Sequence, residues 1–318
     1  MMLFNKIRKY NRERINRRRY AFKINGECIW HDRQKHAEKC CVVLAGYKPF
    51  LWDCFFERLV KFIPDNIDVC IVSSGVHNEK LMKIAENNNW SYLSMKRNCV
   101  SLAQNRAIYL HSSAKFIYKI DEDIFLTKNC FENLYDTYNA AENGKYYVGF
   151  VAPLIPINGY GHVRILQKLG LENIWKEKFG EIKMAGSAEF ARPIEKNPQA
   201  AKFFWGDGDV VPSIDELNRQ FQKELPSFGI CPIRFSIGCI LFSRSVWEHM
   251  GMFTVPKKGN GMGLDEEQLC AYCVNYSRVM VVSENTVVGH LSFGAQNKEM
   301  EAYYLSNADK FKIIARDS

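Results

Sequence analysis

The sequence predicts an α/β fold with a mainly parallel sheet that is flanked by helices. From residue 40 onward, short apolar runs rich in Val, Ile and Cys alternate with longer segments of helical periodicity. Each apolar run has the length of a strand that is buried on both faces. Strands that alternate with helices in this order are typical of parallel sheets, and 318 residues suffice for one large domain or two small ones.

The first half of the chain carries the clearest pattern. We expect four strands at 40–45, 68–72, 90–93 and 116–120, and three connecting helices at 51–63, 79–87 and 101–111. Pro64 ends the first helix, and a run of three asparagines at 87–89 ends the second. Ser101 is placed to cap the third helix.

The second half is less regular. We expect helices at about 164–178, 213–224, 244–250 and 265–276, and strand-like segments at 234–243, 279–283 and 286–290. Several Gly and Pro residues favour an insertion or lid at 151–235 over further parallel sheet. The expected organisation is a basic N-terminal extension (1–39), a first half (40–130) and a second half (131–318).

The composition indicates a globular protein with a substantial core, because 47% of the residues are hydrophobic and 13% are aromatic. No run approaches the roughly 20 apolar residues of a transmembrane helix, and the N-terminus lacks the apolar core of a signal peptide. We therefore expect a cytoplasmic protein whose eleven cysteines are reduced thiols in the core. Cys270 and Cys273 form a C-x-x-C pair, but no second pair completes a zinc site.

The net charge of +8 is concentrated in residues 1–23, where nine Lys or Arg residues face a single acidic residue, Glu13. Interleaved apolar residues make the segment resemble a basic amphipathic helix or arm. It is a solvated tail, a contact with an anionic membrane surface or lipid pyrophosphate on the inner face of the membrane, or a nucleic-acid contact. The rest of the chain is nearly neutral, which argues against nucleic acid as a partner.

Small and acidic residues follow the expected strands at their carboxyl ends, the edge at which open α/β sheets bind ligands. The three runs are Gly46-Tyr47, Ser73-Ser74-Gly75 and Asp121-Glu122-Asp123. The last one is a D-x-D arrangement, whose two carboxylates suit a divalent cation that offsets the charge of a departing diphosphate. The alternative is that both aspartates are solvated loop residues.

Residues 40–130 resemble the nucleotide-binding half of GT-A glycosyltransferases, especially bacterial enzymes similar to family 2. The resemblance rests on Ala103-Gln104-Asn105-Arg106 in a helix and on the acidic triplet after the strand 116–120. It implies a GT-A fold, a nucleotide-sugar donor (a UDP-sugar is expected) and Mn²⁺ or Mg²⁺. The implied nucleotide contacts are Ala45, Gly46, Ser73, Ser74, Arg106 and Asp121, and the implied metal ligands are Asp121, Asp123 and His290.

The second half resembles the acceptor side of the same family in two places. One is Ser236-Ile237-Gly238-Cys239 with the segment 244–253, and the other is the acidic run 264–269. The acidic run implies Glu266 as the catalytic base, with Asp265 beside it. As an alternative or an addition, Asp265 and Gln268 have the spacing of a helix capping box.

The resemblance implies transfer of a sugar from a nucleotide-sugar to a glycan or lipid-linked acceptor, with inversion, in the synthesis of a surface polysaccharide. Two other functions stay open. A sugar nucleotidyltransferase should carry a Gly-rich, basic phosphate loop after the first strand, and residues 44–49 match that poorly. A non-catalytic module could bind a membrane surface through residues 1–23.

Overall fold

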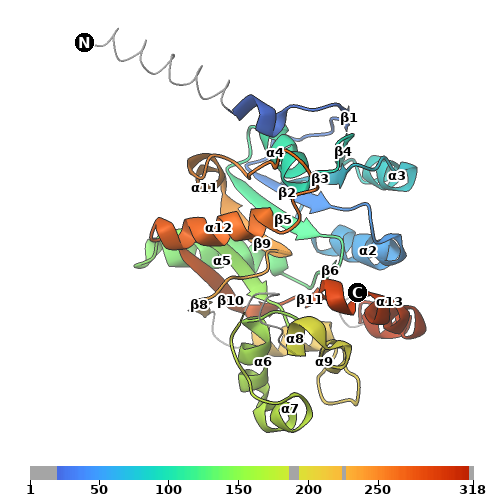
Figure 1. The fold of residues 1–318 in the computed structure, drawn as a ribbon, viewed down its shortest axis with the longest axis vertical. Coiled ribbons are helices and arrows are strands. Elements are labelled where there is room, and N and C mark those ends of the chain that lie inside the picture. The colour runs from blue at the N-terminus through green and yellow to red at the C-terminus, as the bar shows by residue number, and fades with distance from the viewer. Residues whose placement is uncertain (1–19, 186–192, 224–226, 315–318) are drawn as a thin grey trace.

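The structure is a computed structural model that describes residues 20–185, 193–223 and 227–314. Its centre is a nine-stranded sheet with the strand order β1-β4-β3-β2-β5-β9-β7-β10-β8 (Figure 1). Two further short strands, β6 and β11, pair with each other. The strand bounds are β1 Cys28–His31, β2 Lys39–Leu44, β3 Ile67–Ser74, β4 Ser91–Met95, β5 Phe116–Asp121, β6 Ile124–Phe125, β7 Val148–Leu154, β8 Phe228–Ile230, β9 Cys239–Ser243, β10 Val279–Val287 and β11 Gly289–His290.

The central part of the sheet is parallel. Strands β4, β3, β2 and β5 run in one direction, and β7 and β10 are also parallel to each other. Strand β9 lies antiparallel between β5 and β7, while β1 and β8 pair antiparallel at the two edges. The predicted α/β class with a mainly parallel sheet is therefore confirmed.

Helices cover both faces of this sheet. On β5, the ring of Tyr118 lies 5.1 Å from that of Phe131 in α5, so the next residue, Lys119, points to the opposite face, where α4 and α12 lie. Helices α6 to α9 gather at one end of the molecule (bottom of Figure 1). The helix bounds are α2 Trp52–Phe62, α3 Glu79–Asn87, α4 Val100–Leu110, α5 Cys130–Asn143, α6 Gly161–Leu169, α7 Glu172–Phe179, α8 Pro193–Lys196, α9 Pro198–Phe204, α10 Ile214–Gln222, α11 Arg244–His249, α12 Leu264–Asn275 and α13 Asn297–Ser306.

All seven elements predicted between residues 40 and 120 are present, with ends that differ by at most two residues. The second half departs further from the prediction. The helix expected at 164–178 is two helices, α6 and α7, because Gly170 adopts a left-handed conformation (φ 67°) and ends α6. The strand expected at 234–243 begins only at Cys239.

Several elements were not predicted at all, among them α5, α13, β1 and β7. Strand β7 contains Pro153, which is unusual inside a sheet, and it is tolerated where the register with β10 shifts between Ser283 and Val287. Strand β1 lies within the range assigned to the N-terminal extension, yet it pairs with β4. The end of β7 likewise extends the sheet into the predicted insertion at 151–235.

The basic segment 1–23 lies outside the described residues up to position 19. Residues 20–24 are helical, and Lys23 donates to the carbonyl of Gly251 at 2.7 Å, in the turn after α11. None of the helices in the described ranges combines the length and apolar composition that a bilayer span requires.

The cysteines occupy the core, as predicted. All eleven are free thiols, and ten of them are buried, whereas Cys28 is half-buried. Burial raises the pKa of Cys270 to about 11 and that of Cys273 to about 12, so both stay protonated at neutral pH.

A buried arginine, Arg58, links four segments that are far apart in the sequence. Arg58 in α2 is fully buried and pairs in bidentate fashion with Asp215 in α10, at 2.8 and 2.9 Å. Its guanidinium also donates to the carbonyls of Leu126 and Phe311, each at 2.9 Å. Arg58 thus connects the first half of the chain with the predicted insertion and with the C-terminal segment.

We predict that Arg58→Met lowers the free energy of unfolding by about 3–5 kcal/mol, because the carboxylate of Asp215 would remain buried without a partner. The double variant Arg58→Met/Asp215→Leu should recover most of that loss, since neither charge remains. Urea unfolding of the three proteins measures both effects. A double variant as unstable as the single one would contradict this account of the pair.

Candidate active site

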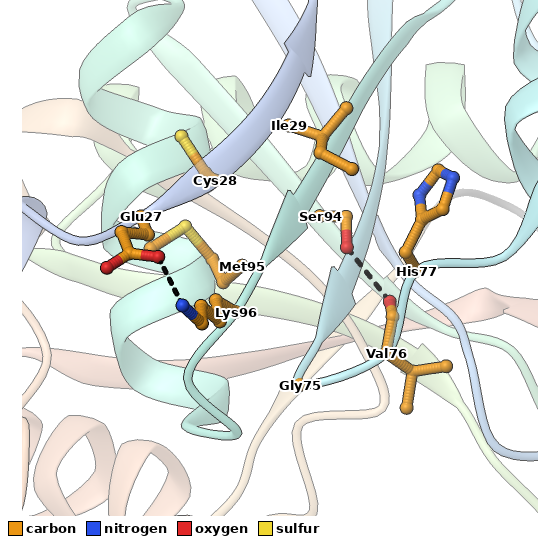
Figure 2. A pocket seen from close by; sticks show the side chains of 9 residues that line it. All are labelled: Glu27, Cys28, Ile29, Gly75, Val76, His77, Ser94, Met95 and Lys96. Carbon is orange, nitrogen blue, oxygen red and sulfur yellow. Dashed lines mark hydrogen bonds and ion pairs between the residues drawn. The ribbon is translucent and has the colours of Figure 1, made fainter.

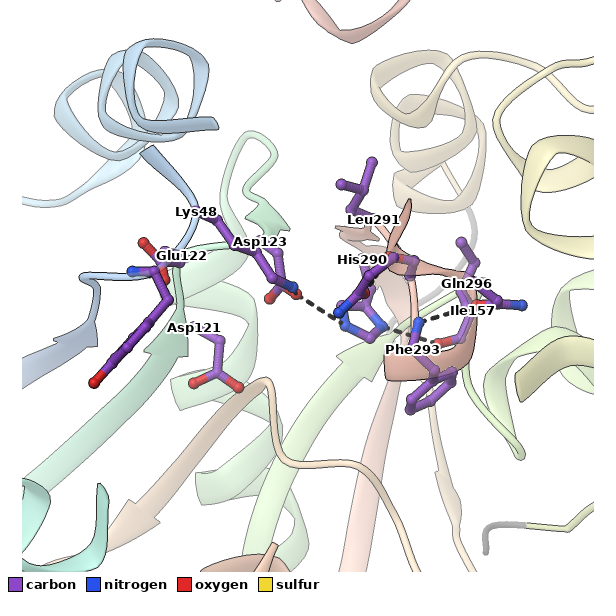
Figure 3. A network of polar contacts seen from close by, with 12 residues as sticks. Lys48, Asp121, Glu122, Asp123, Ile157, His290, Leu291, Phe293 and Gln296 are labelled. Carbon is purple, nitrogen blue, oxygen red and sulfur yellow. Dashed lines mark hydrogen bonds and ion pairs between the residues drawn. The ribbon is translucent and has the colours of Figure 1, made fainter. Parts of the chain in front are cut away.

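Three consecutive carboxylates lie at the edge where the parallel strands end: Asp121 is the last residue of β5, and Glu122 and Asp123 form the turn before β6 (Figure 3). The antiparallel strand β9 brings Gly238 alongside, and its carbonyl accepts from the amide of Asp121 at 2.8 Å. Strand β11 pairs with β6 and brings His290 opposite Ile124. Segments from both halves of the chain therefore meet at the acidic run.

Glu122 fastens the loop that follows β2. Its carboxylate accepts from the backbone amides of Gly46 at 3.0 Å and Tyr47 at 2.9 Å, and from the indole of Trp52 at 2.6 Å. The side chain is buried, so three donors compensate its desolvation. The middle residue of the D-x-D run thereby fixes the backbone that carries Lys48.

Asp123 faces two basic side chains. Lys48 Nζ donates to its Oδ2, and His290 Nε2 lies 3.5 Å from the same oxygen. Burial alone would raise the pKa of Asp123, but the charges of His290 and Lys48 outweigh it and lower the pKa far below its usual range. Asp123 is therefore an anion at every pH at which the protein is expected to work.

His290 has the orientation of a metal ligand. Its Nδ1 lies 3.3 Å from the carbonyl of Ile157, which can only accept, so Nδ1 carries the proton and Nε2 is directed toward Asp123. A backbone carbonyl on the other ring nitrogen is the usual support of a metal-bound histidine. The described residues contain no ready-made group of three acidic, His or Cys ligands. Two protein ligands fit a Mn²⁺ or Mg²⁺ ion whose remaining positions are filled by phosphate oxygens and water.

Asp121 is held by a buried lysine two residues earlier on the same strand. Lys119 Nζ lies 2.7 Å from its carboxylate, and the lysine side chain is only 5% exposed. Burial disfavours the charge of Lys119, but Asp121 and Asp265 outweigh this and raise its pKa. Burial raises the pKa of Asp121 to about 6; Lys119 opposes this rise, and the charges of Asp123 and Asp265 add to it.

Asp265 lies in the first turn of α12 and is buried on the same face as Lys119. Gln104 of α4 donates to its Oδ2 at 2.7 Å. The predicted capping box with Gln268 is wrong, because Gln268 instead binds the amide of Thr254 at 2.6 Å and the carbonyl of Met252 at 2.9 Å. The carboxylate of Asp265 therefore does not cap α12.

Glu266, the next residue, differs from Asp265 in its surroundings. It pairs with Arg234 at 2.6 Å and keeps 22% of its side chain exposed. Burial raises the pKa of Glu266, and Arg234 only partly opposes this rise. Of the two carboxylates, Glu266 is the more accessible, because Asp265 is only 5% exposed.

The predicted nucleotide contacts separate into two groups. Ala45 and Gly46 follow β2 directly beside the acidic run. The hydroxyl of Ser73 is within 3.3 Å of that of Tyr92, and Ser74 accepts from the amide of Cys99 at 2.7 Å, so both side chains are already bonded inside the fold.

Arg106 is not brought to the acidic run by any described contact. Its guanidinium lies 6.0 Å from the ring centroid of Tyr109, in the same helix. Gln104 is the α4 side chain that reaches the site.

An aromatic ring lies across the ends of β2 and β3. The hydroxyl of Tyr47 donates to the carbonyl of Ser74, its amide is bound by Glu122, and 53% of the residue is exposed. Beyond it, a pocket of about 330 Å³ opens at the ends of β3 and β4 (Figure 2). The pocket is lined by Glu27, Cys28, Ile29, Gly75, Val76, His77, Ser94, Met95 and Lys96.

The pocket and the acidic run lie at the ends of strands that are two positions apart in the sheet. Strands β3 and β5 are separated by β2, and two strand spacings amount to about 10 Å. A diphosphate beside Asp123 could therefore extend its ribose and base over Tyr47 toward the pocket.

Sequence reasoning missed Lys48, Lys119 and Arg234, named Tyr47 only as a residue at a strand end, and gave Glu122 no role. Lys119 had a visible signal, because a lysine inside the apolar strand run 116–120 is unusual unless its charge is paired. Tyr47, Arg234 and Lys48 contact residues that are 27, 32 and 75 positions away, respectively. No local sequence pattern marks such contacts.

Comparisons with known proteins add a structural likeness. No protein-family model matches the chain, and no curated protein is similar to it in sequence. Its structure is similar to the mannosyltransferase PcManGT from Pyrobaculum calidifontis in complex with GDP-Man and Mn²⁺. The two share 12% identity with a TM-score of 0.46, over 90% of this chain and 68% of that one.

The raised pKa of Asp121 predicts a pH effect on stability in metal-free buffer. The folded protein keeps a proton up to pH of about 6 that the unfolded chain loses near 3.8, so the free energy of unfolding should fall as the pH rises between these values. Asp121→Asn lacks this proton. The stability of the wild type minus that of the variant, from urea unfolding, should decrease between pH 4 and 6. A flat or rising difference would show that the pKa is not raised.

Proposed function

We propose that this protein is a metal-dependent glycosyltransferase that moves a sugar from a nucleotide-sugar to a glycan or lipid-linked acceptor. The observation that carries the proposal is the meeting of Asp123 and His290 beside Asp121 at the carboxyl end of β5. A carboxylate and a correctly oriented imidazole at a strand end are suited to a divalent ion shared with a diphosphate. The resemblance of residues 40–130 to GT-A enzymes supports the same function.

The donor would lie along the ends of β2, β3 and β5. Asp123 and His290 would hold Mn²⁺ or Mg²⁺, with Asp121 contacting the ribose or the ion through water. A divalent ion there supplies charge neutralisation for the departing diphosphate. Ala45 and Gly46 would border the ribose and diphosphate, and the exposed ring of Tyr47 offers the base an apolar surface.

Glu266 would accept the proton of the acceptor hydroxyl. Its pKa is raised by burial, which improves a carboxylate as a general base near neutral pH, and it keeps an exposed edge that an acceptor can reach. Asp265 is fully buried and bonded to Gln104, so it fits a positioning role better than proton transfer. A base on the acceptor side favours inversion at the anomeric carbon.

The finer parts of the proposal rest on resemblance. We propose a UDP-sugar as donor, residues 40–130 as the donor half and 131–318 as the acceptor half, in surface polysaccharide synthesis. Contact of residues 1–23 with an anionic membrane surface also stays a proposal, because positions 1–19 lie outside the described residues.

Ligand screening followed by product analysis tests the function. Binding to the folded state alone raises the melting temperature, so UDP-, GDP-, CMP- and dTDP-sugars should be screened with and without Mn²⁺. Asp123→Ala should abolish the shift and reduce transfer about a hundredfold or more, because the cation loses its principal anionic ligand.

Asp207→Ala is the matched control for that variant. Asp207 belongs to a second D-x-D run, 207–209, in an exposed turn after α9, and its loss should leave transfer unchanged. Release of nucleoside diphosphate from the sugar donor would support glycosyl transfer, whereas release of pyrophosphate from a nucleoside triphosphate and a sugar 1-phosphate would indicate nucleotidyl transfer. Full activity of Asp123→Ala in chelator would refute metal dependence.

A further inference from the structure

Lys48 occupies the carboxylate at which the proposed function needs a divalent ion. Its ammonium donates to Asp123 Oδ2, the same oxygen that His290 Nε2 approaches at 3.5 Å (Figure 3). The lysine side chain is 23% exposed and that of Asp123 is 9% exposed, so water screens this pair less than a surface ion pair. Burial disfavours the ammonium, but the charge of Asp123 outweighs it and raises the pKa of Lys48.

The fold holds Lys48 in this position. Glu122 binds the amides of Gly46 and Tyr47, the two residues immediately before it. Pro49, immediately after it, begins a short 3₁₀ helix that leads into α2. The backbone is therefore fixed on both sides, by two bonded amides before Lys48 and by a helical turn after it.

A divalent ion between Asp123 and His290 conflicts with this ammonium. An ion that uses Oδ2 must displace Lys48, and an ion that uses only Oδ1 would still lie within a few ångströms of a like charge. Among the described residues, three carboxylates act on Lys48, and Asp123 is the one it would leave. The other two that act on it are engaged already, Glu122 by three donors and Asp121 by Lys119.

A diphosphate removes the conflict. It brings its own negative charge to the strand ends, and its oxygens accept hydrogen bonds from an ammonium as readily as a carboxylate does. Lys48 could then turn from Asp123 to the diphosphate while the divalent ion takes its place.

We propose that Lys48 is a resident counter-ion that keeps divalent metal off Asp123 until a nucleoside diphosphate arrives and receives the ammonium. This inference rests on the proposed function. It adds to it that the divalent metal and the nucleotide bind cooperatively. Coupling between two ligands is reciprocal, so each should raise the affinity of the other by the same factor. Lys48 is the residue that sets this factor.

Mn²⁺ titration followed by the EPR signal of the free ion tests the proposal without measuring transfer. Lys48→Met should bind Mn²⁺ without nucleotide about tenfold more tightly than the wild type, or more, because a charge in contact with the ligand is gone. Lys48→Gln keeps a hydrogen-bond donor but no charge and should behave in the same way. UDP, with GDP as a second probe, should raise the Mn²⁺ affinity of the wild type by a larger factor than that of either variant.

Two control variants assign the effect to this contact. Lys80 in α3 forms an exposed ion pair with Asp53 in α2. Lys80→Met also removes one lysine charge and should leave Mn²⁺ binding unchanged. Adding Asp123→Asn to Lys48→Met should abolish the gain, because the new affinity depends on that carboxylate. Melting curves of each variant establish that it is folded.

Equal Mn²⁺ affinity of the wild type, Lys48→Met and Lys48→Gln would overturn the proposal, even if the wild type proves to be an active glycosyltransferase. Conversely, the proposed function could fail while this inference holds. In that case Lys48→Met would gain Mn²⁺ affinity at Asp123 although no nucleotide-sugar is consumed.

Discussion

Three adjacent carboxylates at the end of a buried strand repel one another, and the structure around them is built to compensate that charge. Each one has its own partner: Asp121 has Lys119, Glu122 has two backbone amides and an indole, and Asp123 has Lys48 and His290. These partners give the three residues different properties. Glu122 holds the loop after β2, burial raises the pKa of Asp121 to about 6, and the neighbouring positive charges lower the pKa of Asp123.

The antiparallel strands explain how one acidic run can serve both halves of the chain. The amino end of β9 meets the carboxyl end of β5, so Gly238 lies against Asp121, and Arg234 reaches Glu266 from the segment just before β9. The pairing of β11 with β6 does the same for His290. A fully parallel sheet would place the start of the ninth strand at the opposite edge.

The sequence was most informative where structure is local. Strands β2 to β5 are continuous apolar runs with clear helical segments between them. The rule that open α/β sheets bind ligands at the carboxyl ends of their strands identified Asp121 and Asp123. Residues far apart in the chain were harder. The helix-capping pattern at Asp265 was misleading because Gln104, 161 positions away, binds that carboxylate, and β7 was hidden by Pro153. The roles proposed for Asp123, His290 and Glu266 remain predictions.

The central claim is that Asp123 and His290 share a divalent ion with a nucleoside diphosphate. Anomalous diffraction near the manganese edge, from crystals grown with Mn²⁺ and UDP or GDP, locates that ion directly. We predict a single strong peak between Asp123 Oδ2 and His290 Nε2, next to the diphosphate, with Lys48 moved onto a phosphate oxygen. A bound nucleotide with no peak there, and with Lys48 still on Asp123, would contradict the account.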